Sequence, residues 1–166
     1  MLQTRRLLLR SQEPADAEVF HKLWAERDAR VPAHRRLDAQ GRPTARDIAE
    51  DIRASRVASL LLTVVRSESH DVLGYAGLVF AGKGVEDEPE IAFELLRDVH
   101  GNGYATEAGE AVVLWARQLG HRRLWASVWD WNLASRRVLE KLGFREDGEP
   151  GPPTEHGRMI LTVRDV

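Results

Sequence analysis

Hydrophobic residues in this chain follow two kinds of spacing, which together predict a mixture of strands and helices. Short runs rich in apolar and β-branched residues, bounded by polar turns, are typical of strands. Strands are expected on this pattern at 5–10, 60–65, 72–80, 90–96, 124–129, in a segment that starts at Phe144, and at 158–163.

Apolar residues three and four positions apart predict helices between these strands. Pro14 suits the first turn of the first helix, and Thr44 suits the N-cap of the second. The third helix spans 106–119 and ends at Gly120, and the fourth follows the N-cap residue Asn132. Their expected inner faces are Val19, Phe20, Leu23 and Trp24; Ile48, Ala49 and Ile52; Ala108, Val112, Trp115 and Leu119; and Val138, Leu139 and Leu142.

The remaining segments are expected to be loops, among them 28–43, the turn at 67–71 and a hairpin at 82–89. The order of elements is then β-α-α-β-β-β-α-β-α-β-β, which is an α+β arrangement. Neither an internal repeat nor a break in composition divides the chain. Residues 1–166 are therefore expected to form a single domain.

Composition excludes several classes of function. The chain of 166 residues is 43% hydrophobic and 30% charged, and its formal net charge of −2 gives no electrostatic attraction to nucleic acid or to an anionic membrane. No apolar run approaches the roughly 20 residues that a membrane span needs. The chain has no cysteine, and its six histidines lack metal-ligand spacing, so no metal is expected. These features favour a cytoplasmic protein with neither a nucleic-acid nor a membrane partner.

The strongest chemical signal is the strand at 90–96 and the glycine turn that follows it, His100-Gly101-Asn102-Gly103-Tyr104-Ala105-Thr106. The turn opens a helix, whose first amides have no partner within the helix and lie at the positive end of its dipole. Such a helix start binds phosphate. The two glycines let a pyrophosphate approach the main chain without a Cβ in the way. An ordinary strand–helix turn is the competing interpretation.

This turn and a second segment together resemble the GNAT acetyltransferases. The family's turn has the form Gln/Arg-x-x-Gly-x-Gly/Ala, which Gly103 and Ala105 match, while His100 occupies the position of the usual Gln or Arg. The second segment is NLASRRVLEKLGF at 132–144, and the opening LQTRRLLLR at 2–10 resembles the ribosomal-protein N-terminal (RimJ/RimL-like) branch. The resemblance implies the GNAT fold, a mixed and mostly antiparallel sheet flanked by helices.

The resemblance implies acetyl-CoA as the donor. Its pyrophosphate would lie on the amides of 101–106, and its pantetheine arm would pair with the main chain of 93–95, where the strand is splayed from the one at 124–129. A backbone N–H near Phe93 or Glu94 would polarise the thioester carbonyl. The residues implied to hold the donor are Phe93, Leu95, His100, Gly101, Asn102, Gly103, Tyr104, Ala105, Thr106, Asn132, Ser135 and Lys141, with Arg136 as a further phosphate partner.

Attack by a primary amine needs a free lone pair, so a general base is expected. The family commonly places a glutamate on this strand, which makes Glu90 the first candidate and Glu94 the second, although Glu90 also fits a solvated strand end. Strand alternation places both glutamates on one face. In many members the general acid is a tyrosine seven residues after the asparagine of the second motif, where this chain has Leu139. Ser135 is the alternative acid, and a plain helix-start residue is the competing interpretation.

The expected reaction is transfer of an acetyl group from acetyl-CoA to a primary amine by direct attack. The RimJ/RimL-like opening makes the α-amino group of a protein or peptide the first choice of acceptor, and a small amine or antibiotic the second. A non-catalytic acetyl-CoA-binding regulatory domain is an alternative of another class. A dinucleotide-binding oxidoreductase is disfavoured because Thr106 occupies the position of the third glycine. Both a monomer and a homodimer are compatible with the sequence.

Two further groups of side chains attract notice. Tryptophans fall on alternate positions at Trp125, Trp129 and Trp131, a stripe more typical of packing or a dimer contact than of a ligand cage. The loop 28–43, which by resemblance forms a wall of the acceptor site, carries Arg30, His34, Arg35 and Arg36. These cations could bind an acidic acceptor, although a solvated loop is the simpler interpretation. Acidic residues at 86–88 could instead attract a cationic acceptor.

Overall fold

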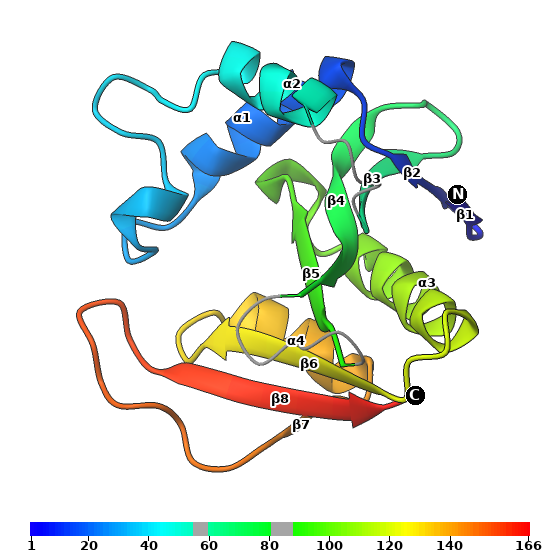
Figure 1. Ribbon diagram of the computed structural model, residues 1–166, viewed down its shortest axis with the longest axis vertical. Coiled ribbons are helices and arrows are strands. Elements are labelled where there is room, and N and C mark those ends of the chain that lie inside the picture. The colour runs from blue at the N-terminus through cyan, green and yellow to red at the C-terminus, as the bar shows by residue number, and fades with distance from the viewer. Residues whose placement is uncertain (55–59, 81–87) are drawn as a thin grey trace.

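A mixed β-sheet runs through the molecule and organises the helices around it (Figure 1). The computed structural model describes residues 1–54, 60–80 and 88–166. The strands within these ranges are β1 (Leu2–Gln3), β2 (Leu7–Ser11), β3 (Leu61–Arg66), β4 (Val72–Val79), β5 (Glu90–Leu95), β6 (Arg123–Trp129), β7 (Arg145–Glu146) and β8 (Met159–Asp165). The helices are α1 (Ala17–Glu26), α2 (Ala45–Ala54), α3 (Tyr104–Gln118) and α4 (Leu133–Lys141), with short 3-10 turns at Pro14–Asp16, Ala33–Arg35 and Arg97–Val99.

The strand order across the sheet is β1-β2-β3-β4-β5-β6-β8-β7. Neighbouring strands pair antiparallel except β5 and β6, which run parallel. The parallel pair arises because the chain leaves β5 through α3, and a helical crossover of this kind returns the next strand in the same direction. The order of elements and the mostly antiparallel sheet confirm the fold class that the sequence predicts.

The helices cover different parts of the sheet. Figure 1 shows α1 and α2 on one side of β3–β5 and α3 on the other. The ring of Phe20 in α1 meets Tyr75 of β4 edge-on, with 6.0 Å between the ring centroids. Helices α3 and α4 come close together at Gly109, where an added Cβ would lie only 2.5 Å from Leu142. The buried residues of α3 are small or β-branched: Ala108, Gly109, Val112, Val113 and Ala116.

Directly paired strand residues form a polar row across the face that α1 covers. The register pairs Arg10 with Thr63, Thr63 with Tyr75, and Tyr75 with Glu94. Asp16, only 1% exposed, accepts hydrogen bonds from the Arg10 guanidinium at 2.7 and 2.8 Å and from the Thr63 hydroxyl at 2.7 Å. Burial opposes ionisation of Asp16, but these hydrogen bonds outweigh it and hold its pKa below the usual value.

The predicted N-cap at Thr44 is confirmed by its capping contacts, whereas Pro14 lies in a 3-10 turn and α1 begins only at Ala17. Thr44 accepts a hydrogen bond from the Asp47 backbone N–H, and the Asp47 carboxylate accepts one from the Thr44 N–H in return. The prediction that Leu119 belongs to the inner face of α3 is wrong, because the helix ends at Gln118 and Leu119 is 49% exposed. The predicted hairpin at 82–89 lies mostly outside the described residues.

The tryptophan stripe extends beyond the strand predicted at 124–129, which the structure confirms as β6. Trp125 and Trp129 belong to β6, but the strand ends at Trp129, so Trp131 lies in the turn that leads to α4. Of the helices that the structure describes, none is both long and apolar enough to cross a membrane.

The buried Asp16 carboxylate makes a testable contribution to stability. Replacing Asp16 by Asn removes one member of a buried ion pair and should lower the free energy of unfolding at pH 7 by about 3 kcal/mol. The folded-state pKa of Asp16 lies below its unfolded value, so this contribution is present above pH 4 and is lost as the pH falls through the folded-state pKa. Urea unfolding at pH 7 and at pH 3 measures both effects.

The exposed Asp47→Asn variant is the matched control for this measurement, because it removes a carboxylate that caps a helix at the surface. The account of Asp16 is contradicted if the two variants lose the same stability at pH 7, or if the Asp16 variant loses as much at pH 3 as at pH 7.

Candidate active site

The two parallel strands β5 and β6 pair at one position only and then separate. Their register contains the single pair Glu90 and Trp125, and the Trp125 N–H donates to the Pro89 carbonyl at 3.0 Å. Beyond that point β5 stays paired with β4 as far as Leu95, and β6 stays paired with β8 as far as Trp129. A gap therefore opens between the carboxyl ends of the two strands, as the family resemblance implies.

Strand alternation shows which main-chain groups face this gap. The Pro89 carbonyl points to β6, because it accepts from the Trp125 N–H. The Leu96 N–H points to the opposite edge, because it donates to the Leu73 carbonyl of β4. Backbone groups of alternate residues point to opposite edges of a strand, so those of Phe93 and Leu95 face the gap. This placement favours the Phe93 N–H over that of Glu94 as the donor to a thioester carbonyl. Leu95 is 7% exposed and its side chain belongs to the core, and its carbonyl is bonded to the His100 ring, so only its N–H is available.

The glycine turn lies beyond the end of β5 and begins α3. Gly101 and Gly103 both have φ of 79°, a left-handed conformation that favours glycine, and Gly103 is the N-cap of the helix. No side chain caps this helix start. The first main-chain bond of the helix runs from the Glu107 N–H to the Gly103 carbonyl, which leaves the amides of residues 104–106 ahead of it. This geometry fits a phosphate group.

An ion pair that the sequence analysis missed holds the glycine turn in place. The Arg6 Nε donates to Glu107 at 2.7 Å, and the Arg6 Nη1 donates to the Asn102 carbonyl at 3.0 Å. Glu107 also accepts from the Thr4 hydroxyl at 2.6 Å and from the Arg6 backbone N–H at 2.8 Å. Burial opposes ionisation of Glu107, but the bonds from Thr4 and Arg6 outweigh it and lower the pKa. Arg6 thereby neutralises a carboxylate beside the expected phosphate site.

Two other residues expected near the donor phosphates, Lys141 and His100, differ in their contacts. Lys141 lines a cavity of about 600 Å3 together with Gly103 and Thr106, so α4 does bring this cation to the start of α3. His100 is exposed, and its Nε2 lies 2.8 Å from the Leu95 carbonyl and must donate to it. Only the other ring nitrogen of His100 is then available to a ligand.

Helix α4 begins on the opposite side of the gap. The Asn132 side chain caps the helix by accepting from the Ser135 N–H at 3.2 Å. Asn132 follows directly from β6, so this helix start and that of α3 flank the two separating strands. Leu139, at the position of the family's tyrosine, is 3% exposed and lies in the core. Its side chain offers no proton, and Ser135 remains the predicted acid.

The two candidate bases have different surroundings. Glu90 lies at the closed end of the gap and is 9% exposed. Glu94 lies further along β5, where it forms a two-pronged ion pair with Arg27: Nε to Oε1 at 2.8 Å and Nη2 to Oε2 at 2.6 Å. The Tyr75 hydroxyl also donates to Glu94 at 2.8 Å. Proton uptake by Glu94 would break this ion pair.

The contacts of Glu94 change the pKa values of its partners. Burial raises the pKa of the Tyr75 hydroxyl, and the neighbouring Glu94 carboxylate raises it further, so Tyr75 stays protonated. Burial lowers the pKa of Arg27, but the hydrogen bonds and charge of Glu94 outweigh it and raise the pKa overall. No sequence signal marks Arg27 or Tyr75, because they come together only through the packing of α1 on β4 and β5. Across the residues that the structure describes, no group of three or more histidine, aspartate or glutamate side chains is arranged to hold a metal ion.

Comparison with known proteins gives the family. The sequence profile of the acetyltransferase (GNAT) domain matches residues 6–145, which is most of the chain. The protein therefore belongs to the GNAT family and is an N-acetyltransferase that uses acetyl-CoA. It is also 28% identical over 152 residues to the uncharacterized N-acetyltransferase p20 from Bacillus licheniformis, covering 89% of this chain and 83% of that protein.

Solved structures agree on the fold. A GNAT-family acetyltransferase from Bacillus anthracis superposes with a TM-score of 0.82 at 21% identity, covering 99% of this chain and 97% of the other. The yncA protein of Salmonella typhimurium, whose structure contains its cofactor acetyl-CoA, superposes with a TM-score of 0.73 at 18% identity, covering 97% and 94%.

The contact between Arg6 and the glycine turn predicts a defect in donor binding. Arg6→Ala removes the bond to the Asn102 carbonyl and leaves the Glu107 carboxylate without its cation near the phosphates. A charge-assisted hydrogen bond contributes about 1.5–3 kcal/mol, so the Kd for CoA should rise by about tenfold or more. Calorimetric titration with CoA measures the change, with Arg53→Ala, on the exposed surface of α2, as the control. An unchanged Kd for the Arg6 variant would contradict this role.

Proposed function

We propose that the protein acetylates the α-amino group of a protein or peptide, and that Glu90 is the general base. The observation that carries the proposal is the gap between β5 and β6. It has the amide-lined start of α3 at its open end and Glu90 at its closed end. The opening 2–10, which resembles the RimJ/RimL-like branch, supports a protein or peptide as the acceptor.

The residues present fit acetyl-CoA. The amides ahead of α3 and the Lys141 ammonium match the phosphates in charge, and the main chain of Phe93 and Leu95 faces the gap where an extended arm could pair. When bound, acetyl-CoA supplies a thioester, whose carbonyl carbon forms a bond to the amine nitrogen while its C–S bond breaks. The Phe93 N–H would donate to the carbonyl oxygen as that oxygen gains negative charge.

Proton transfer is assigned to two residues of this chain. Glu90 takes the proton that the attacking amine gives up, directly or through one water molecule. Ser135 donates a proton to the departing thiolate and regains one from solvent. The second transfer is the less demanding, because a thiol with a pKa of about 8.5 already leaves readily as the thiolate.

The role of Glu90 predicts a change in rate rather than in donor binding. Glu90→Gln keeps the size of the side chain but removes the base, so kcat should fall by about 100-fold or more while the Kd for CoA stays within twofold. Initial rates of thiol release test the fall in kcat, and calorimetric titration with CoA tests the Kd. The control is Glu50→Gln on the exposed face of α2, and a Glu90 variant with the rate of that control would remove Glu90 from the mechanism.

The acceptor is tested with a panel of amines. We expect mass spectrometry to find acetyl groups on the α-amino nitrogen of unblocked peptides, and none on the same peptides with a blocked N terminus and a free lysine. Acetylation of spermidine or an aminoglycoside alone would make the small-amine alternative correct. Binding of acetyl-CoA without turnover on any amine would indicate the non-catalytic regulatory domain instead.

A further inference from the structure

The segment that follows α1 concentrates positive charge beside the candidate acceptor side of the gap. Residues 27–36 read RDARVPAHRR, with four arginines, one histidine and one aspartate. The segment begins at Arg27, whose guanidinium binds Glu94 of β5, and the Arg27 Nη1 also donates to the Arg35 carbonyl at 2.6 Å. The main chain of Arg35 is therefore hydrogen-bonded to the Arg27 guanidinium, which also forms the ion pair with Glu94 of β5.

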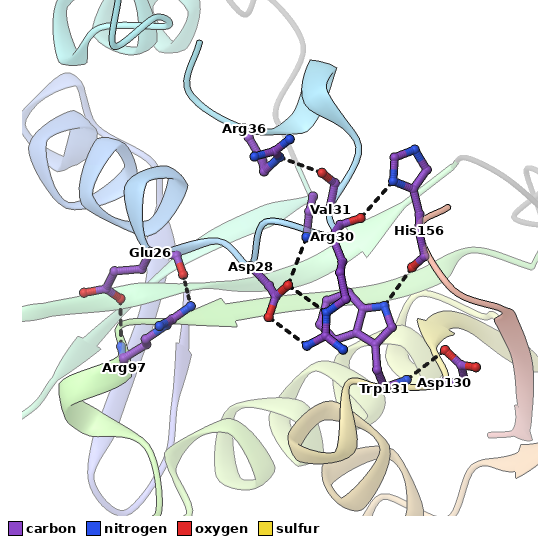
Figure 2. A network of polar contacts seen from close by, with 9 residues as sticks. All are labelled: Glu26, Asp28, Arg30, Val31, Arg36, Arg97, Asp130, Trp131 and His156. Carbon is purple, nitrogen blue, oxygen red and sulfur yellow. Dashed lines mark hydrogen bonds and ion pairs between the residues drawn. The ribbon is translucent and has the colours of Figure 1, made fainter. Parts of the chain in front are cut away.

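Two loops, which carry Trp131 and His156, hold this segment against the far half of the sheet (Figure 2). The Arg30 guanidinium stacks on the ring of Trp131, 4.0 Å from its centroid. The Trp131 indole N–H donates to the His156 carbonyl at 2.7 Å, and the His156 Nδ1 donates back to the Arg30 carbonyl at 2.9 Å. Together the three residues form a closed ring of contacts, which we call the Trp131 clasp. The clasp holds residues 27–36 in one position across the ends of β5 and β6.

Two acidic groups that contact this segment are already paired with its arginines. Glu94 is bound by Arg27, and the Asp28 carboxylate accepts from the Arg30 Nε and Nη2, each at 2.9 Å. Neither Arg35 nor Arg36 has an ion pair with a carboxylate among residues 1–54, 60–80 and 88–166. Arg36 is instead bonded to the Val31 carbonyl at 2.6 Å, as Figure 2 shows.

Arg35 is exposed, and its main chain is held beside the ion pair of Arg27 and Glu94. Burial and the Glu94 carboxylate raise the pKa of the Tyr75 hydroxyl, whereas the charges of Arg27 and Arg35 lower it. The Tyr75 hydroxyl is bonded directly to Glu94, and Glu94 binds the same Arg27 guanidinium that holds the Arg35 carbonyl. This places an uncompensated cation next to the face of the gap that lies opposite α3.

We propose that the acceptor carries a carboxylate close to its reactive amine, as in a peptide N terminus followed by Asp or Glu, and that Arg35 binds this carboxylate. The inference rests on the proposed function and specifies its substrate class. A guanidinium binds a carboxylate through two parallel hydrogen bonds, and Arg35 has both edges of its guanidinium available. The same positive charge repels a polyamine. It also favours the neutral form of the acceptor amine, which is the form that attacks.

The test compares acceptors that differ only in charge. The peptides Ser-Asp-Glu, Ser-Asn-Gln and Ser-Lys-Lys, each extended by one common neutral tail, are assayed by thiol release at low and moderate ionic strength. We expect kcat/KM to be at least tenfold higher for the acidic peptide than for the neutral one, and lowest for the basic peptide and for spermidine. The preference should shrink as salt is added. Free glutamate, assayed in parallel, distinguishes a small acidic amine from a peptide.

Variants assign the preference to Arg35. In Arg35→Glu the ratio of acidic to neutral kcat/KM should fall at least tenfold, mainly through KM, and Arg35→Lys, which keeps the charge but not the paired hydrogen bonds, should retain only part of it. Arg117→Glu makes the same charge change on the exposed end of α3 and should leave the ratio unchanged. Equal rates on all peptides, or a preference for the basic one, would overturn the inference and leave the proposed function intact. Failure of every amine to react would overturn the proposed function itself.

Discussion

The architecture of the site depends on one constraint, which is that β5 and β6 run parallel but pair only at Glu90 and Trp125. Each strand is held along its other edge, β5 by β4 and β6 by β8, so neither can move across to close the gap. The main-chain groups that face the gap need other partners, because a backbone N–H or C=O is seldom left unpaired. The Leu95 carbonyl already accepts from the His100 ring, and an extended donor that pairs with the main chain of Phe93 and with the Leu95 N–H would provide the other partners. Because the two strands diverge, α3, which follows β5, and α4, which follows β6, begin on opposite sides of the gap.

Two ion pairs fix the walls of that opening. Arg6 and Glu107, which are 101 residues apart in sequence, hold the first strands against the glycine turn on the donor side. Arg27 and Glu94, which are 67 residues apart, hold the end of α1 against β5 on the other side. Each pair has further hydrogen bonds, from Thr4 to Glu107 and from Tyr75 to Glu94. A partly buried ion pair with this geometry fixes the relative position of two chain segments. These residues therefore shape the site, while the chemical steps are assigned to other side chains.

The sequence predicted the features that depend on neighbouring residues and missed those that depend on distant ones. The N-caps at Thr44 and Asn132, the glycine turn and the order of elements all follow from local spacing, and the structure confirms them. Periodicity did not reveal which of 24 basic and 26 acidic residues pair, so the two ion pairs and the Trp131 clasp were not predicted. The end of the strand at Trp129 was predicted, whereas the contacts of Trp131 beyond it depend on the distant residues Arg30 and His156. The assignments of Glu90, Ser135 and the donor contacts remain predictions, supported by their placement around the gap.

The central claim is that acetyl-CoA lies in the gap between β5 and β6 with its phosphates at the start of α3. Hydrogen exchange measured with and without acetyl-CoA, with NADH as the control nucleotide, tests this most directly. The account predicts that acetyl-CoA alone slows exchange of the amides in 91–95 and 101–106, while those of α2, on the other side of the sheet from α3, are unchanged. Protection confined to other segments, or equal protection by NADH, would contradict it.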